Sequence, residues 1–202
     1  MPVKLDIWSD YNCPWCFMAS QSVAMLEASH GVEVEWHSYE LRPKGSPPIP
    51  ESYMKRIEET RPRLAAMAQE QFGITLKPGR FGIDSRPALI GAKFAETQGK
   101  GNEYHKAVMS AYWEQGRDIE DIVVLEDIAV SLGLEGADFL ASLKDRSYEA
   151  LVDTDILTAQ QMELSGVPAL LFEHKYLIPG AQPYDELVNA LEYVKKCENI
   201  TA

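Results

Sequence analysis

The chain has 202 residues, of which 46% are hydrophobic and 25% are charged, and this mixture is typical of folded globular proteins. The composition argues against a disordered, collagen-like or coiled-coil chain, and the length favours one domain or one domain with an insertion. Acidic residues outnumber basic ones by 31 to 19, which gives a net charge of −12. Because so negative a surface repels phosphate groups, we expect neither nucleic acid nor a membrane as a partner.

The sequence contains no apolar run near the ~20 residues that would cross a bilayer. Asp6 and Asp10 interrupt the N-terminal segment before a secretory signal could form, so we expect a cytoplasmic protein. The three cysteines are Cys13, Cys16 and Cys197. Three is an odd number and too few for a disulfide scaffold in a chain of this length, so the close pair indicates chemistry.

The first part of the chain predicts a strand, a helix and a second strand. The two strands are marked by alternating hydropathy over residues 3–8 and 32–37, and the helix by helix-forming residues over 17–28. Asp10 and Asn12 are candidate helix caps, Pro14 fits the first helical turn, and Gly31 is placed to end the helix. The Cys-x-x-Cys pair therefore falls at the start of the first helix.

Residues 51–164 show almost no alternating pattern and predict a block of helices. The expected helices cover about 51–72, 85–99, 103–115, 121–132, 136–143 and 147–164. We expect Pro62 to interrupt the first of them. Asp84 or Ser85 is expected to cap the second, with Pro87 in its first turn.

The last part of the chain predicts two strands and a helix, over residues 166–172, 176–178 and 185–197. Glu173, His174 and Lys175 must form the turn between the strands without a Gly or Asn. The order β-α-β, helices, β-β-α resembles an α/β thioredoxin fold with a large all-helical insertion. We therefore predict a thioredoxin-like domain of residues 1–47 and 165–202, and a helical insertion domain of residues 48–164.

The pair Cys13 and Cys16 fits thiol–disulfide exchange, in which a thiolate is the nucleophile. Amide groups and the dipole at a helix N-terminus favour an anion by roughly 0.3–2 kcal/mol. Cys13, just before the first turn, is expected to be the exposed nucleophile. Cys16 lies deeper and is expected to resolve the mixed disulfide. Pro14 and Trp15, which separate the two cysteines, are expected to set how strongly the helix N-terminus stabilises the charge on their sulfurs.

Zinc binding is the main alternative for this pair, because one Cys-x-x-Cys supplies half of a zinc site. The remaining ligands would have to come from Cys197, His30, His37, His105 or His174. None of these residues forms a second pair at metal-binding spacing, so we expect no metal and interpret Cys197 as an idle thiol. His37 is the histidine that we would inspect near the site.

Val167 and Pro168 begin an apolar strand, where a proline cannot donate to the sheet. Most X–Pro bonds are trans, and the residues alone favour that form. With the Cys-x-x-Cys upstream, we predict a cis bond beside the active-site sulfur. The backbone of Val167 would then be free to pair with an extended substrate.

Four segments carry a resemblance to a known family: Asp10-Tyr11-Asn12-Cys13-Pro14-Trp15-Cys16, Tyr39-Glu40-Leu41-Arg42-Pro43, Gly166-Val167-Pro168 and Gly180-Ala181-Gln182-Pro183-Tyr184. They are similar, in order, to segments of the DsbA-like oxidoreductases of the FrnE-type branch. The resemblance implies a thiol–disulfide oxidoreductase without metal or bound cofactor. It makes Cys13 the nucleophile, Cys16 the resolving thiol and Pro168 the cis-proline, and it agrees with a cytoplasmic location. The turn at 173–175 departs from the Asn-Gly that is common in this branch.

A sister branch resembles 2-hydroxychromene-2-carboxylate isomerases and kappa-class glutathione transferases. These enzymes activate glutathione with a serine at the position of Cys13, so both cysteines here argue for redox chemistry. The expected partners are protein or small-molecule disulfides, and glutathione stays open as a co-substrate. A glutathione-dependent isomerase or transferase is the second hypothesis. A non-enzymatic adaptor or chaperone, with the dithiol as a switch, is the third.

Overall fold

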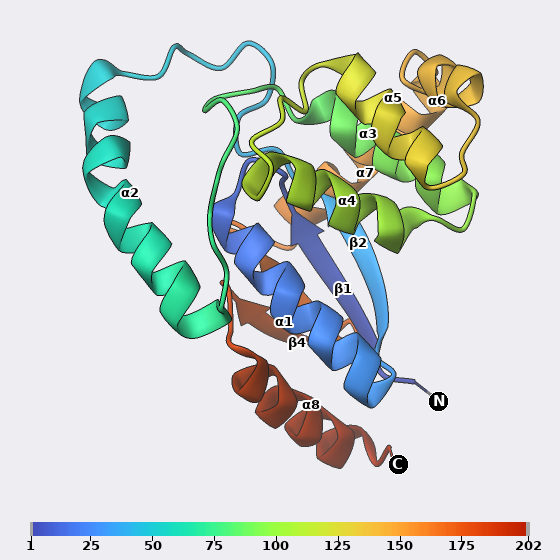
Figure 1. Ribbon diagram of the computed structural model, residues 1–202. Helices are drawn as coiled ribbons and strands as arrows, with labels where there is room; N and C mark the ends of the chain where they lie inside the picture. The colour runs from blue at the N-terminus through green and yellow to red at the C-terminus, as the bar shows by residue number, and fades with distance from the viewer. Residues whose placement is uncertain (1, 201–202) are drawn as a thin grey trace.

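A four-stranded sheet lies at the centre of the molecule, with the strands in the order β2-β1-β3-β4 (Figure 1). Strand β1 (Lys4–Ser9) runs parallel to β2 (Glu33–Ser38) and antiparallel to β3 (Ala169–Phe172), and β3 is antiparallel to β4 (Tyr176–Pro179). The computed structural model describes residues 2–200. This sheet and the helices around it confirm the predicted α/β thioredoxin class.

Helices α1 (Pro14–His30) and α8 (Tyr184–Glu198) cover one face of the sheet (Figure 1). The contact is apolar and almost fully buried, and it includes Leu5, Ile7, Leu170 and Phe172 of the sheet, Val23 and Leu26 of α1, and Leu187 and Leu191 of α8. Each such side chain contributes about 1.5–3 kcal/mol by leaving water. This layer is the rigid support on which the first turn of α1 stands.

The ends of α1 follow from two residues with restricted backbone preferences. Pro14 occupies the first turn, and Gly31 ends the helix in a left-handed conformation with φ of 64°. The N-cap is Cys13, so the expectation that Asp10 or Asn12 caps this helix is wrong. Asp10 instead accepts a hydrogen bond from the amide of Cys13 through its backbone carbonyl, at 3.0 Å, which forms a turn before the helix.

The opposite face of the sheet is apolar at one end and polar at the other. Trp8, Ala169 and Leu171 pack against Ala159 of helix α7 (Arg146–Gln161). Further along β1 and β2 the same face carries acidic and basic side chains, and those of Lys4, Glu33 and Glu35 are exposed. The face is therefore covered by α7 over only part of its area.

Six helices lie between β2 and β3 in the sequence. They are α2 (Glu51–Phe72), α3 (Arg86–Thr97), α4 (Gly101–Trp113), α5 (Ile122–Ser131), α6 (Gly136–Ser142) and α7. Helices α3 to α6 share a buried cluster with the start of α1, including Cys13, Cys16, Tyr104 and Phe139. Division of the chain into two domains at residues 47 and 165 stays a prediction. No helix within the described residues is both long and apolar enough to cross a membrane.

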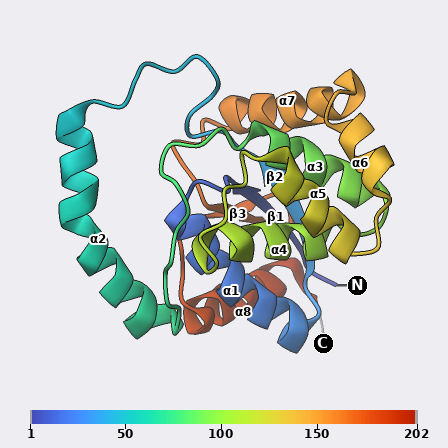
Figure 2. The ribbon, with the colours of Figure 1, turned by 45° about the horizontal axis from the view of Figure 1, so that its top comes forward.

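Helix α2 stands apart from the other helices (Figures 1 and 2). Of its 22 residues only Ala68 is buried. The expected interruption at Pro62 is wrong, because the helix runs through this proline. A proline inside a helix removes one hydrogen bond and costs about 3 kcal/mol. Here the neighbouring residues are exposed, so water is available to the carbonyl group that loses its donor.

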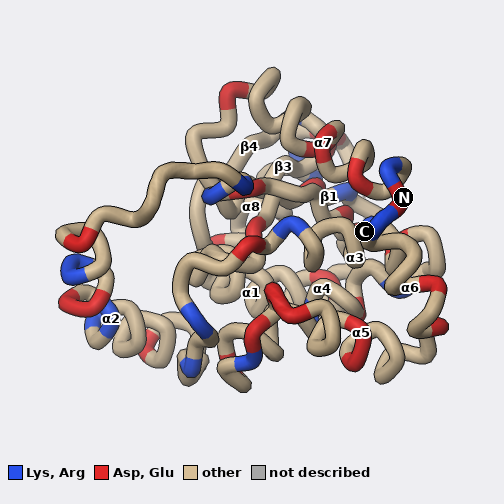
Figure 3. Tube along the Cα trace, turned by 90° about the horizontal axis from the view of Figure 1, so that it is seen from above, with Lys and Arg blue, Asp and Glu red and all other residues tan. Residues whose placement is uncertain are grey.

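Charges are unevenly distributed over these helices. Both signs alternate along α2, whereas α5 to α7 carry mainly acidic residues (Figure 3). The negative net charge is thus concentrated away from α2.

The β3–β4 turn forms without glycine or asparagine. Glu173 and His174 both adopt the left-handed region, with φ of 50° and 54°. The amide of Lys175 donates to the carbonyl of Phe172 at 3.0 Å, and the amide of Glu173 donates to the carbonyl of Lys4 at 3.0 Å. The turn is therefore held against the start of β1, and this backbone pairing compensates for the unfavourable residues.

Candidate active site

The two segments that sequence analysis singled out meet at the start of α1. The thiol of Cys13 donates to the carbonyl oxygen of Val167, and the sulfur lies 3.5 Å from this oxygen. The peptide bond between Val167 and Pro168 is cis, as predicted. Cys13 is the N-cap of α1, so the amide groups of the first turn point toward its end of the helix.

Cys13 is less accessible than the sequence suggested. We expected an exposed nucleophile, but only 3% of this residue is exposed. The reason is that the residue packs in a buried cluster against which Val167, of the cis peptide bond, and Ala181 also pack. Trp15, with 39% exposure, is the part of the motif that faces solvent, and Pro14 is half-buried.

Cys16 lies one turn further along α1 and is fully buried, as the deeper position of a resolving thiol requires. Burial raises the pKa of Cys16 well above its usual range, and the neighbouring Cys13 adds to this effect. The backbone of Asp10 and the side chain of Ser9 oppose this rise in the pKa of Cys16. Both thiols are free, so the structure represents the dithiol state.

Asp10 is a buried carboxylate that organises the loop before the dithiol. Its two oxygens accept hydrogen bonds from the amide of Asn12 at 3.0 Å and from the amide of Leu41 at 2.7 Å. Burial raises the pKa of Asp10, although these amide groups oppose the rise. Sequence reasoning treated this residue only as a helix cap and missed its role. Its position three residues before Cys13 was the available signal.

Residues between β2 and β3 also hold this loop. The side-chain amide of Asn12 donates to the carbonyl of Ile83 at 2.8 Å, and the indole N–H of Trp113 donates to the carbonyl of Tyr11 at 2.9 Å. Trp113 also stacks on Phe17 in the first turns of α1. The helical segment therefore fixes the backbone that leads into the motif.

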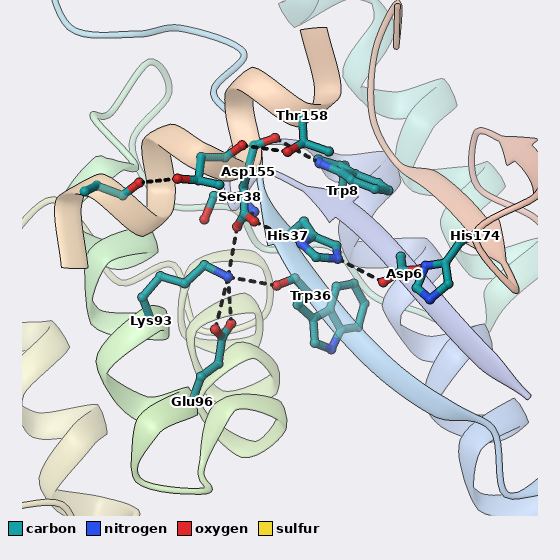
Figure 4. Close-up of polar contacts among 12 residues, drawn as sticks. Asp6, Trp8, Trp36, His37, Ser38, Lys93, Glu96, Asp155, Thr158 and His174 are labelled. Carbon is teal, nitrogen blue, oxygen red and sulfur yellow. Dashed lines mark hydrogen bonds and ion pairs between the residues drawn. The ribbon is translucent and has the colours of Figure 1, made fainter. Parts of the chain in front are cut away.

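A network of charges that is buried at Lys93 and exposed at Glu96 joins α3, α7 and β2 (Figure 4). Asp155 pairs with Nδ1 of His37 at 2.9 Å and with Lys93 at 2.9 Å, and Lys93 also pairs with Glu96 at 3.0 Å. Burial disfavours a charged His37, but hydrogen bonds to Asp155 and Asp6 outweigh it and raise the pKa of His37 to about 9. His37 therefore binds carboxylates and neither thiol. Sequence analysis did not anticipate this network.

The residues named for a zinc site do not gather around the dithiol. Within residues 2–200, no third His, Cys, Asp or Glu ligand atom joins Cys13 and Cys16 at metal-binding distance. Cys197 is exposed in the last turn of α8. The site thus consists of two thiols, a helix N-terminus and a carbonyl next to a proline.

These features define a thioredoxin-fold protein with a Cys-x-x-Cys pair at the start of its first helix. The chain belongs to the DSBA-like thioredoxin domain family, whose profile matches residues 4–192. It is 29% identical over 204 residues to the uncharacterized protein YwbO of Bacillus subtilis, and the match covers 97% of this chain and 99% of YwbO.

Solved structures of the same fold include an oxidoreductase, an isomerase and a reductase. The probable DsbA oxidoreductase SCO1869 of Streptomyces coelicolor has a TM-score of 0.84 at 23% identity, covering 99% of this chain and 92% of that one. A 2-hydroxychromene-2-carboxylate isomerase has a TM-score of 0.82 at 18% identity, covering 98% and 100%. The cytosolic disulfide reductase DsbM of Pseudomonas aeruginosa, solved with GSH, has a TM-score of 0.73 at 20% identity, covering 96% and 99%. At 18–23% identity, these likenesses show a shared fold.

Proposed function

We propose that this protein is a thiol–disulfide oxidoreductase that acts on protein or small-molecule disulfides through Cys13 and Cys16. The observation that carries the proposal is the meeting of three features at one point. The sulfur of Cys13 lies at the N-terminus of α1, 3.5 Å from the carbonyl of Val167, with the free thiol of Cys16 one turn away. An oxidised partner can therefore be attacked and released without any further group.

The reaction has two exchange steps. Cys13 loses its proton and its thiolate attacks one sulfur of a substrate disulfide, which forms a mixed disulfide and releases the other sulfur as a thiolate. Cys16 then attacks the sulfur of Cys13, which forms the intramolecular disulfide and releases the second substrate thiolate. The two released thiolates take up protons, so the substrate gains two electrons and the protein loses two. The reverse sequence oxidises a dithiol substrate.

The carbonyl of Val167 gives the substrate a means to free the nucleophile. In the dithiol state this oxygen accepts the S–H of Cys13, and a carbonyl oxygen cannot stabilise a thiolate. An extended substrate whose backbone N–H binds Val167 would take over this acceptor. We therefore propose that Val167 and Pro168 bind the substrate backbone, and that Pro14 and the exposed Trp15 contact its side chains.

Disulfide reduction by single-cysteine variants tests this function. Cys13→Ser should abolish the reduction of insulin in the presence of a thiol reductant, whereas Cys16→Ala should accumulate a covalent complex with the substrate. Cys197→Ser is the matched control, because this thiol is exposed on α8, and it should retain full activity. Full activity of Cys13→Ser would overturn the proposal.

A glutathione-dependent isomerase or transferase is the second candidate. The full-length likeness to a 2-hydroxychromene-2-carboxylate isomerase and the GSH in the structure of DsbM support it. Loss of Cys16 separates the two candidates, because glutathione addition or isomerisation needs one sulfur and dithiol exchange needs two. Turnover of a glutathione-dependent substrate that survives Cys16→Ala would favour this second function. The cytoplasm is the compartment that we propose, since DsbM is described as cytosolic.

A further inference from the structure

A second group of chemically reactive side chains lies on the polar part of the sheet face, outside the dithiol site. Asp6 of β1 and Glu35 and His37 of β2 each present one ligand atom, and these atoms lie within 4.8 Å of one another. His174 joins them from the β3–β4 turn, with its Nδ1 2.7 Å from Oδ2 of Asp6. Figure 4 shows His37, Asp6 and His174 side by side.

The fold brings these four residues together from three separate segments. Asp6 and Glu35 are register partners on neighbouring parallel strands, and His37 follows two residues later on the same face. Hydrogen bonds between the turn and Lys4 place His174 beside Asp6. The cluster therefore joins β1 and β2, near the N-terminus of the chain, to the β3–β4 turn, near its C-terminus.

One carboxylate oxygen in this cluster lacks a hydrogen-bond donor. Asp6 is 5% exposed, and its buried Oδ2 has no hydrogen-bond partner. Nδ1 of His174 lies 2.7 Å from this oxygen and forms an ion pair with it only when the imidazole is protonated. Leaving a buried polar oxygen without a partner is costly, and a cation between this oxygen and the imidazole would satisfy both.

The imidazole of His37 is oriented for ligation by a carboxylate behind it. Its Nδ1 pairs with Asp155 at 2.9 Å, and the other oxygen of Asp155 is held by the amide of Ser38 at 2.7 Å and by Lys93. This arrangement leaves Nε2 facing Asp6, at 3.1 Å from Oδ1. Carboxylates that orient histidines in this way are typical of metal sites.

We propose that Asp6, Glu35, His37 and His174 bind a late first-row divalent cation of the Zn²⁺ type. Two imidazoles and two carboxylates suit this class, whereas Mg²⁺ and Ca²⁺ prefer oxygen ligands alone. Metal–ligand bonds of about 2.0–2.1 Å place tetrahedral ligand atoms roughly 3.3 Å apart. Nε2 of His37 lies 3.1 Å from Oδ1 of Asp6, close to this value, whereas Nδ1 of His174 lies 2.7 Å from the other oxygen, Oδ2. Asp6, Glu35 and His37 therefore form the existing ligand group, and the exposed His174 has to rotate to complete it.

The surroundings admit a cation. Asp6 and Glu35 line a surface hollow together with Lys4 and Glu33, so a cation can reach these two carboxylates from solvent. The two carboxylates offset the charge of a dication, and Lys93 neutralises Asp155 behind His37. A bound ion would fasten the β3–β4 turn to β1 and β2. This proposal does not depend on the thiol chemistry of Cys13 and Cys16.

Metal titration of a thiol-free protein tests the site. Cys13→Ser, Cys16→Ser and Cys197→Ser together remove competing sulfur ligands. In this background we expect Co²⁺ to bind at one equivalent, with visible absorption bands, no sulfur charge-transfer band and displacement by Zn²⁺. Zn²⁺ should also shift the imidazole NMR signals of His37 and His174 and leave those of His30 and His105 in place.

Two exposed ligands can be changed without disturbing the core. Glu35→Gln and His174→Gln should each weaken Co²⁺ binding at least tenfold. The matched controls, Glu33→Gln in the same hollow and His30→Gln on α1, should change it less than threefold. Absence of Co²⁺ and Zn²⁺ binding below 100 µM would overturn the proposal. Equal binding by the parent and the double variant Glu35→Gln/His174→Gln would do so too.

Discussion

The imidazole of His105 stacks on the indole of Trp36, with ring centroids 3.7 Å apart and planes inclined by 14°. His105 belongs to α4 and Trp36 to β2, so the stack joins the sheet to the helices that follow it. His105 is 4% exposed, and its Nε2 has no hydrogen-bond partner within the described residues. The helix and the sheet are therefore held together by an uncharged histidine.

This burial predicts a pH-dependent stability. Burial lowers the pKa of His105 to about 3, and the charge of Lys106 adds to the effect. The unfolded chain takes up a proton below its ordinary value near 6.5, whereas the folded protein does not. The stabilising contribution is therefore complete above about pH 6.5 and decreases as the pH falls toward 3. At pH 5 the loss amounts to about 2 kcal/mol.

Urea unfolding at pH 7, 6 and 5 measures this loss against His105→Phe. The phenyl ring keeps an aromatic stack but cannot be protonated. We expect the free energy of unfolding of the parent to fall more steeply than that of the variant, since other titrating groups contribute equally to both. Parallel curves would contradict the prediction.

We predict that replacing Gly91 of α3 by a larger residue disturbs the packing of the core. A Cβ at this position would overlap the hydroxyl of Tyr104 and lie 2.8 Å from Cε2 of Phe139. Because both neighbours are buried and tightly packed, Gly91→Ala should destabilise the protein by about 1–3 kcal/mol. Gly166→Ala is the matched control, since nothing lies within 4 Å of a Cβ there. Thermal unfolding of the two variants compares them directly, and equal melting temperatures would refute the packing argument.

We predict that removing the side chain of Trp15 weakens substrate binding and leaves the stability of the protein unchanged. Trp15 lies between the two cysteines in the sequence and is 39% exposed, so a substrate can bury its side chain. Removing this contact costs about 1–2 kcal/mol, which corresponds to about tenfold in kcat/KM for disulfide reduction. We expect this loss for Trp15→Ala at unchanged unfolding temperature. Tyr193→Ala, which removes a 62% exposed ring from α8, should leave kcat/KM unchanged. An equal effect of both variants would show that the indole makes no special contact.

The buried thiol of Cys16 predicts a pH-dependent second step. Burial raises the pKa of Cys16, so at neutral pH only a small fraction is a thiolate, and this fraction grows about tenfold per pH unit. Resolution of a mixed disulfide at Cys13 should accelerate accordingly between pH 6 and pH 9. Stopped-flow release of a labelled peptide measures it, with Cys16→Ala as the variant that cannot release. A rate independent of pH would be inconsistent with a buried resolving thiol.

Local patterns were sufficient to predict most of the elements. Alternation predicted β1 and β2, Gly31 predicted the end of α1, and the Cys-x-x-Cys pair pointed to the cis bond between Val167 and Pro168. These features depend on a few neighbouring residues and a known preference. The prediction at Pro62 was wrong because a proline penalises a helix by about 3 kcal/mol without forbidding it, and α2 continues through this residue.

Long-range contacts account for what the sequence did not predict. The low exposure of Cys13 depends on Val167, which is 154 residues away. The ion pair between Lys93 and Asp155 likewise forms only because α3 and α7 pack side by side, which the sequence of either helix alone does not reveal. Asp10 looked like a cap because its partner Leu41 is distant in the sequence.

The small number of buried residues in α2 has a consequence for local unfolding. A helix with a single buried residue and a proline at its middle gains little from the rest of the protein, so it can open by itself. Amide hydrogens in α2 should exchange with solvent long before those of β1, and a protease should cut there first. The dithiol, which is supported by the sheet and α4, would stay in place during such local opening.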